Sequence, residues 1–185
     1  MVPKTFPHDK TLEVAQACVC LHVQRAARAL ARHFDDVFRP LGLTNGQFSL
    51  LMSLNRSEPP SIGQLAPFLA MDRTTLTALV KPLERRGLLA VLADAGDRRK
   101  RRLGLTPAGN ALLLRAYPLW REAHAELHRR LGDADALRSQ LMSIAPLTGG
   151  NGDAALSVGA TVPGAVASGT ASVRESVRDE HCLQD

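Results

Sequence analysis

The chain has 185 residues and a formal net charge of +5, enough for one domain with an additional segment. No apolar run approaches the ~18 residues that a membrane-spanning helix needs, residues 1–10 lack the apolar core of a signal peptide, and three cysteines do not make a disulfide framework. We therefore exclude a disulfide-rich secreted protein and a transmembrane protein, and expect a cytoplasmic one that does not bind membranes.

Charge is unevenly distributed along the chain. Residues 61–109 carry nine Lys/Arg and four Asp/Glu, an excess equal to that of the whole chain, whereas residues from 148 onward are net acidic. A basic excess confined to one segment is typical of proteins that bind nucleic acid.

The first 60 residues predict a loose arm and two helices. Residues 1–10 contain two prolines and are expected to form a flexible arm. Apolar residues then recur at three- and four-residue steps from Thr11 to Phe38, which predicts one long helix that Pro40 ends. Because one small domain cannot bury a helix of that length, part of its apolar stripe is expected to meet a partner subunit. Thr44 caps the next helix. Its inward residues are predicted to be Phe48, Leu51, Met52 and Leu54.

Two short helices follow at residues 61–86. Ser61 is a suitable N-cap for the first, Ala70 and Met71 make a tight turn, and Asp72 caps the second. The inward face of the second helix is predicted to be Leu76, Leu79, Val80 and Leu83. Its other face is short and polar, which suits base edges and phosphates in a DNA major groove. That face consists of Arg73, Thr74, Thr75, Thr77 and Ala78.

A basic hairpin comes next. Gly87 ends the helix, residues 88–92 and 103–105 are compatible with paired strands, and residues 94–97 supply turn chemistry. One arm then carries five consecutive cations, Arg98, Arg99, Lys100, Arg101 and Arg102. Their self-repulsion favours a role in contacting phosphates or a minor groove. Helix, turn, helix and basic hairpin together predict a winged helix-turn-helix, a mainly α fold with a small β-hairpin wing.

The C-terminal part predicts two more helices and a tail. Thr106 and Pro107 begin a long helix in the favoured cap-then-proline order, and Pro118 is expected to kink it. Asp133 caps a last helix whose apolar stripe is Leu137, Leu141 and Ile144. Residues 148–185 are rich in Gly, Ala, Ser and Val without a period, so we expect them to be disordered.

This ordered set of features resembles the MarR family of bacterial transcriptional regulators (multiple antibiotic resistance regulators), over roughly residues 11–147. The matching residues are Leu41 to Thr44, Ser61 to Leu65, Asp72 to Thr77, Leu83 to Leu88, Asp97-x-Arg99 and Leu105-Thr106-x-x-Gly109. The resemblance implies a homodimer, usually a repressor released by a small-molecule ligand. It assigns residues 61–106 to DNA binding and residues 11–39 and 107–147 to dimerisation.

Specific DNA contacts follow from this interpretation. The helix from Asp72 to Val80 would enter a major groove, and a two-fold axis would put its copy about one DNA turn (roughly 34 Å) away, so the operator should be an inverted repeat. Arg99 is expected to reach a minor groove or its phosphates, oriented by Asp97. The predicted DNA-binding residues are Ser61, Gln64, Arg73, Thr74, Thr75, Thr77, Asp97, Arg98, Arg99, Lys100 and Arg101.

A redox switch is an alternative. The peroxide-sensing branch of the family has a reactive cysteine eight residues before an arginine, and Cys20 has that relation to Arg28. That branch surrounds its cysteine with tyrosines, but the matching positions here are Gln24, Phe34 and Asn45. Cys18 and Cys20, two apart on one helix, would point to opposite sides, and both are more often small packing groups. Cys182, in the tail, could serve only as a distant resolving thiol.

A small-molecule effector is the family's commoner signal. Family members often bind phenolic or other aromatic acids in a cleft between the dimer helices and the winged lobe. Here Cys18, His22, Arg25, Arg28 and Trp120 are available as ligand-binding or redox residues.

Other functional classes receive less support. His124 and His128 have a spacing that can hold a metal, but polar residues at such positions are more often the solvated side of a helix. We predict no metal, no cofactor and no enzymatic activity, because no catalytic constellation is visible. A protein-interaction module without DNA binding is a more distant alternative, and the dense cations of the hairpin argue against it.

Overall fold

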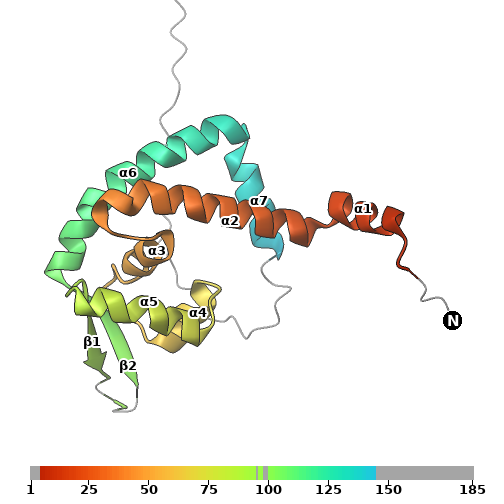
Figure 1. Cartoon of the computed structure of the whole chain (residues 1–185). Helices are drawn as coiled ribbons and strands as arrows, with labels where there is room; N and C mark the ends of the chain where they lie inside the picture. The colour runs from red at the N-terminus through yellow and green to blue at the C-terminus, as the bar shows by residue number, and fades with distance from the viewer. Residues whose placement is uncertain (1–4, 95, 98–99, 145–185) are drawn as a thin grey trace, which may run out of the picture. The chain divides into compact units, whose positions relative to one another are not determined.

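The computed structural model describes residues 5–94, 96–97 and 100–144. These residues form helices and one two-stranded antiparallel sheet, so the predicted fold class is confirmed (Figure 1). The elements are α1 (His8–Ala17), α2 (Val19–Phe38), the 3₁₀ turn η1 (Arg39–Leu41), α3 (Asn45–Ser53), α4 (Ile62–Phe68), α5 (Arg73–Arg85), β1 (Leu89–Ala93), β2 (Arg101–Leu105), α6 (Pro107–Leu131) and α7 (Ala134–Ile144). Within the described ranges, no helix has the length and apolar character to span a bilayer. The predicted tail, with Cys182, lies outside these ranges.

The predicted long N-terminal helix is two helices. α1 begins at His8, inside the segment expected to be a loose arm, and ends at Ala17. Cys18 then has an extended backbone (φ −72°, ψ 102°), and its sulfur accepts a hydrogen bond from the Leu21 N–H at 3.4 Å. The prediction of one continuous helix was wrong because Cys18 caps α2 instead of continuing α1. The placement of Cys18 and Cys20 on opposite sides of one helix therefore no longer applies.

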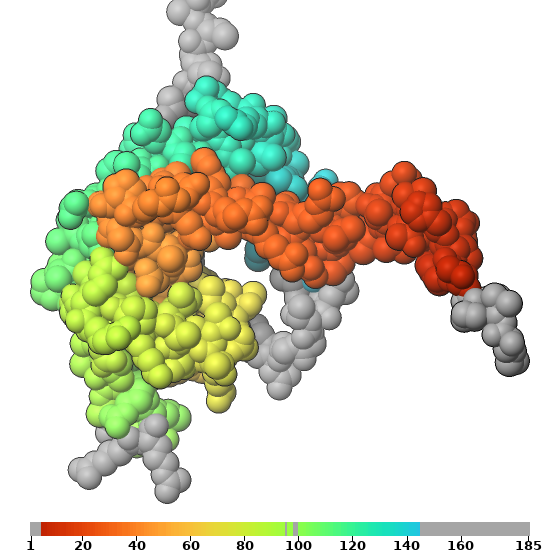
Figure 2. Space-filling model, in the orientation of Figure 1, coloured from red at the N-terminus to blue at the C-terminus, as the bar shows by residue number. Residues whose placement is uncertain are grey.

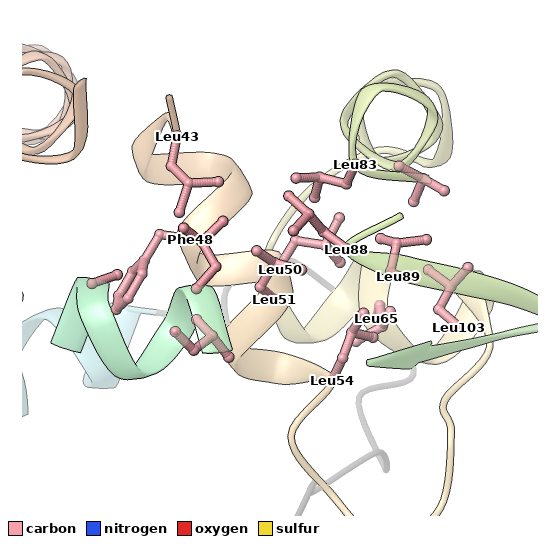
Figure 3. Packing of buried hydrophobic residues seen from close by; sticks show 14 of the residues in the cluster. Leu43, Phe48, Leu50, Leu51, Leu54, Leu65, Leu83, Leu88, Leu89 and Leu103 are labelled. Atoms are coloured by element: carbon pink, nitrogen blue, oxygen red, sulfur yellow. The ribbon is translucent and has the colours of Figure 1, made fainter. Parts of the chain in front are cut away.

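The core is built around α3. This helix contacts α2, α5 and α6 and lies between α2 and α5 (Figure 1). Phe48 of α3 stacks on Phe38 of α2 with ring centroids 4.4 Å apart. Figure 3 shows the leucines of α3 meeting those of α5 and the hairpin. The largest fully buried side chains are Phe38, Leu50, Leu51, Leu65, Leu76, Leu83, Leu89 and Leu103.

One predicted core residue is misplaced. Met52 was expected to face inward but is 40% exposed, whereas its neighbour Leu50 is fully buried. α3 has partners on several sides, so adjacent positions Leu50 and Leu51 are both buried and a single amphipathic stripe does not describe the helix.

The hairpin is tied to the start of α4. β1 and β2 pair antiparallel, with Leu89 opposite Leu105 and Ala93 opposite Arg101. The Leu103 N–H donates to the Pro60 carbonyl oxygen at 2.8 Å, and an isolated bridge joins Ser61 to Arg102. Leu103 is buried beneath these bonds, so the position of the hairpin is fixed relative to the helix-turn-helix.

The start of α6 lies against the start of β1. Thr106 caps α6, because its Oγ1 accepts from the Gly109 N–H at 3.0 Å, and the same hydroxyl donates to the Gly87 carbonyl oxygen at 2.7 Å. A Cβ on Gly109 would lie 2.8 Å from Leu105 Cδ1 and would overlap the Leu88 carbonyl group. Glycine is thus required at position 109, because α6 begins in contact with the Leu88 backbone.

α6 and α5 both continue through a proline. Pro118 lies inside α6, and Pro82 lies inside α5. α6 bends along its length (Figure 1), as expected where a residue without an N–H enters a helix.

Candidate nucleic-acid interface

The first part of the interface is the start of α4. Ser61 Oγ accepts from the Gln64 N–H at 3.3 Å, and Gln64 Oε1 accepts from the Ser61 N–H at 2.9 Å. This reciprocal capping box satisfies two N–H groups that a helix start would leave free. Both predicted backbone-contacting residues are therefore held in place at the end of a helix.

The turn into α5 is equally defined. Ala70 has φ 49°, in the left-handed region. Asp72 then caps α5: one carboxylate oxygen accepts from the Thr75 N–H at 2.8 Å, and the other accepts from Thr75 Oγ1 at 2.6 Å. These bonds from Thr75, the hydroxyl first, hold the pKa of Asp72 below its ordinary value. The first turn of α5 is thereby rigid and oriented.

α5 has a buried and an exposed face. Leu76, Val80 and Leu83 are buried, as predicted, and Leu79 is half-buried. The opposite face exposes Arg73, Thr74 and Thr75, and Thr77 is half-buried beside them.

The three threonines differ in what their hydroxyls can offer. Thr77 Oγ1 donates to the Arg73 carbonyl oxygen at 2.7 Å, and Thr75 Oγ1 donates to Asp72. Their hydroxyl protons are thus used within the helix, which leaves a methyl group and an acceptor oxygen for a ligand. Thr74 Oγ1 has no hydrogen-bond partner among the described residues. A methyl-rich surface with one free hydroxyl suits thymine methyls and base-edge donors.

The basic arm of the hairpin is only partly described. Lys100 and Arg101 are exposed, and Lys100 Nζ lies 3.8 Å from Asp97 Oδ2. Arg98 and Arg99 lie outside the described residues. The roles assigned to Arg99, and to Asp97 as its orienting partner, stay predictions.

Arg102 has a different role from its four cationic neighbours. Its Nε pairs with the Asp94 carboxylate, and its Nη1 donates to the Pro59 carbonyl oxygen at 2.9 Å. The Arg102 guanidinium, more than the turn N–H groups, holds the pKa of Asp94 below its ordinary value. Because Leu92 pairs with Arg102, Asp94 is a same-face diagonal neighbour, and a correct register could have predicted the pair. Arg102 anchors the hairpin to the α3–α4 loop.

A polar groove lies between the start of α4 and the turn of the hairpin. It has a volume of about 490 Å³ and is lined by Ser61 and Gln64 of α4, Arg102 of β2 and the turn residues Asp94, Gly96, Asp97 and Lys100. Figure 2 shows α4 and α5 (yellow to yellow-green) forming one surface with the green hairpin strands beside them. The structure thus brings four of the candidates for DNA contact, Ser61, Gln64, Asp97 and Lys100, together in one groove, and the other described candidates lie on α5 and β2 beside it.

The candidate ligand and redox residues at the start of α2 contact one another, or the Gln24 amide, at four-residue spacing. His22 Nδ1 lies 2.9 Å from the Cys18 carbonyl oxygen. Cys20 is exposed, and its Sγ accepts from Gln24 Nε2 at 3.3 Å. Arg28 Nη2 donates to Gln24 Oε1 at 3.5 Å and thus reaches the amide, not the sulfur. Arg25 is exposed.

Trp120 belongs to a row of rings between α6 and α2. Its ring centroid is 5.8 Å from that of Tyr117 and 4.1 Å from that of His124, which in turn is 4.8 Å from Phe34. Burial lowers the pKa of His124. His128 lies 6.2 Å from His124, ring to ring, and the described residues contain no group of three or more side chains that could hold a metal.

Comparisons with known proteins connect this geometry to a family. A model of the MarR family matches residues 43–100. The transcriptional repressor NicR of Pseudomonas putida is 31% identical over 126 residues, which cover 66% of this chain and 80% of NicR.

Two solved relatives share the fold. The regulator MosR of M. tuberculosis, in complex with DNA, is 38% identical with a TM-score of 0.65, covering 70% of this chain and 95% of that one. The repressor CouR, bound to a 23-mer DNA duplex, is 30% identical with a TM-score of 0.64, covering 77% and 99%. CouR from Rhodococcus jostii RHA1 has also been solved with p-coumaroyl-CoA, at 25% identity and a TM-score of 0.61, covering 70% and 92%.

The redox alternative through Cys20 is not favoured. The descriptions of these relatives name DNA and an acyl-CoA as what they bind. Around Cys20, the sulfur accepts a bond from an amide, and the arginine eight residues later binds that amide instead. A neutral amide donor stabilises a thiolate less than a cation would.

The match to NicR spans most of its length, and the solved relatives cover 70% and 77% of this chain, more than its winged part alone. The predicted resemblance is confirmed, and the relatives are transcriptional regulators, not enzymes. The chain belongs to the MarR family of transcriptional regulators.

Proposed function

We propose that the chain is a cytoplasmic, homodimeric repressor that binds double-stranded DNA sequence-specifically and has no enzymatic activity. One observation carries this proposal: α5, whose first turn is exposed, packs against the hairpin that bears the exposed cations Lys100 and Arg101 (Figure 2). The DNA complexes of MosR and CouR support it, as does the description of NicR as a repressor.

Within this proposal, α5 enters the major groove by its N-terminus. Arg73 and Thr74 would contact base edges, since their side chains are exposed and the Thr74 hydroxyl is available. Thr75 and Thr77 would present methyl groups, because their hydroxyl protons are already donated within the helix. Lys100 and Arg101, with Arg98 and Arg99, would contact phosphates or the minor groove, and Ser61 and Gln64 the backbone at the start of α4.

A second copy of the chain is proposed to cover the apolar surface of the terminal helices. The described chain exposes large apolar side chains on α1, α2 and α7, which a second copy would remove from water. They are Leu12, Val14, Val19, Val23, Leu30, Leu137, Leu141, Met142 and Ile144. Sedimentation analysis should find a dimer, and Leu141→Asp should shift the equilibrium toward the monomer by placing a charge in the buried patch.

A small aromatic or anionic effector is proposed to release the DNA. The p-coumaroyl-CoA complex of CouR supports an effector of this kind. His22, Arg25 and Arg28 on α2, and Trp120 on α6, supply cations and an aromatic ring for it.

The test begins with the full-length protein and a random duplex library, from which bound sequences are selected. We expect an inverted repeat to emerge. On that duplex, Arg73→Ala should weaken binding about 5- to 150-fold, the range for loss of a base contact. Arg101→Ala should weaken binding and lower the salt slope by about one unit. Arg115→Ala is the matched control, because Arg115 is an exposed arginine on α6 and belongs to neither α5 nor the hairpin.

Two results would overturn the proposal. If the selected sequences show no preference, the claim of sequence-specific binding is wrong. If Arg73→Ala and Arg101→Ala both bind with wild-type affinity at about 0.15 M salt, the assignment of these two side chains to DNA contacts is wrong.

A further inference from the structure

A groove separate from the proposed DNA contacts lies where three elements meet. Its volume is about 410 Å³, and its walls come from the α3–α4 loop, the hairpin strands and the first turn of α6. It shares no lining residue with the polar groove beside Ser61.

One wall carries an arginine without a polar partner. The Nε of Arg56 is buried and makes no hydrogen bond within the described part of the chain. Its guanidinium carbon lies 6.0 Å from the centre of the Phe68 ring, a contact that holds the guanidinium plane without using its N–H groups. Because the Nε is buried, a ligand in the groove would reach this cation through its terminal N–H groups, which are not buried and also make no hydrogen bond within the described part of the chain. An unpaired cation in the wall of a groove favours an anionic acceptor.

The neighbouring polar groups suit a carboxylate. Asn55 and Asn110 line the same groove from the α3–α4 loop and from α6. A guanidinium offers parallel N–H donors that match the two oxygens of a carboxylate, and amide groups can donate to the remaining lone pairs.

The rest of the lining is aliphatic apart from Thr106, whose hydroxyl is used in capping α6. Leu54, Pro59, Leu92, Leu105 and Pro107 supply its apolar atoms, and Leu92 is 43% exposed at the hairpin surface. Gly104 forms the floor of the groove beside Leu92. A side chain at this position would crowd the floor, since its Cβ would lie 3.2 Å from Leu92 Cδ1. The described lining contains no aromatic ring, so the walls favour a flexible aliphatic chain over a stacked ring.

We propose that this groove binds a small organic acid, with its carboxylate at Arg56 and an aliphatic body along the leucine and proline wall. The ligand class is a medium-chain monocarboxylate. The site is distinct from the effector residues proposed on α2 and α6. Its walls come from the α3–α4 loop, the hairpin and α6. A bound acid would therefore contact both the hairpin, which Arg102 anchors to the α3–α4 loop, and α6, which follows the hairpin.

Octanoate is the test ligand, titrated calorimetrically into the full-length protein without DNA, so that the result does not depend on the proposed function. Octan-1-ol has the same chain without the charge, and butyrate has the charge with a shorter chain. We expect octanoate to bind at least about tenfold more tightly than either, because both the ionic and the apolar contacts contribute.

Variants separate the two contacts. Arg56→Gln should weaken octanoate binding about 10- to 100-fold, as loss of a charge-assisted hydrogen bond predicts, and leave octan-1-ol binding unchanged. Gly104→Val fills the floor with a side chain that strands favour and should abolish binding of both. Arg115→Gln is the matched control and should bind octanoate as the wild type does.

A measurement on the wild-type protein guards against misfolded variants. In a ¹H–¹⁵N spectrum of the arginine side chains, the Nε–H signal that disappears in Arg56→Gln should shift on octanoate addition and saturate. The proposal fails if octanoate shows no saturable binding up to about 10 mM, if octan-1-ol binds equally well, or if the Arg56 signal does not move at saturation.

Discussion

Replacing Gly109 by alanine tests how closely α6 is held against the start of the hairpin. The added Cβ would lie 2.8 Å from Leu105 Cδ1 and 3.0 Å from the Leu88 carbonyl carbon, and closer still to the carbonyl oxygen. Leu105 could move its side chain, but the Leu88 backbone is fixed because its oxygen accepts from the Thr106 N–H at 3.3 Å. Relief therefore requires α6 to move away from β1.

The expected loss combines two opposing effects. Overpacking typically costs about 1–3 kcal/mol, and we take about 3–4 kcal/mol here because backbone must shift, whereas alanine gains about 1 kcal/mol over glycine in a helix. We expect a net loss of about 2–3 kcal/mol in the free energy of unfolding, which corresponds to a Tm lower by about 4–12 °C for a chain of this size.

Thermal unfolding by circular dichroism, at equal protein concentrations because a dimer is expected, measures this loss. Gly46→Ala is the matched control: in the first turn of α3, its Cβ would meet only Leu79 side-chain atoms at 3.4 Å or more, so Tm should stay the same or rise. A Gly109→Ala protein with the wild-type Tm would refute the close contact of α6 with β1.

Three further predictions concern the caps, the hairpin and pH. Ser61→Ala removes the oxygen that accepts from the Gln64 N–H and should cost about 1 kcal/mol in urea unfolding; an unchanged midpoint would contradict the capping role. Arg102→Gln breaks the bonds to Asp94 and Pro59, so operator affinity should fall several-fold with the salt slope retained; a slope lowered as in Arg101→Ala would instead make Arg102 a phosphate contact. Burial lowers the pKa of His124 from its ordinary value of 6.5, with His128, Arg138 and His33 adding positive charge nearby. The unfolded chain therefore binds this proton more readily, so stability is full above about pH 6.5 and falls as the pH drops through that value. His124→Phe should reduce the difference in Tm between about pH 7.5 and 5.5. If the difference is unaltered, groups other than His124 cause the pH dependence of stability.

The winged part was predictable because its signals are local. Asp72 and Ser61 are polar residues at helix starts, and the structure uses both as N-caps. The buried residues of α5 recur at helical spacing, so periodicity identified Leu76, Val80 and Leu83. The MarR resemblance followed from the order and spacing of these same features.

The wrong predictions have two causes: an unusual local cap and contacts that form only in the folded chain. Cys18 interrupts the N-terminal helix by capping α2 with its sulfur, and cysteine is not a residue that sequence rules assign to a cap. Arg102 was grouped with its exposed neighbours because its partner, Asp94, becomes adjacent only in the hairpin register. Arg56 carried no signal at all, since its unpaired Nε is apparent only once Phe68 and the groove are placed.

The most direct test of the central claim is the affinity of the purified protein for its selected inverted repeat as a function of half-site spacing. A dimer with two α5 helices one DNA turn apart should bind one duplex per dimer, and inserting about five base pairs, half a turn, should reduce affinity to that of random DNA. Affinity that is indifferent to the spacing would contradict paired insertion of α5 into successive major grooves.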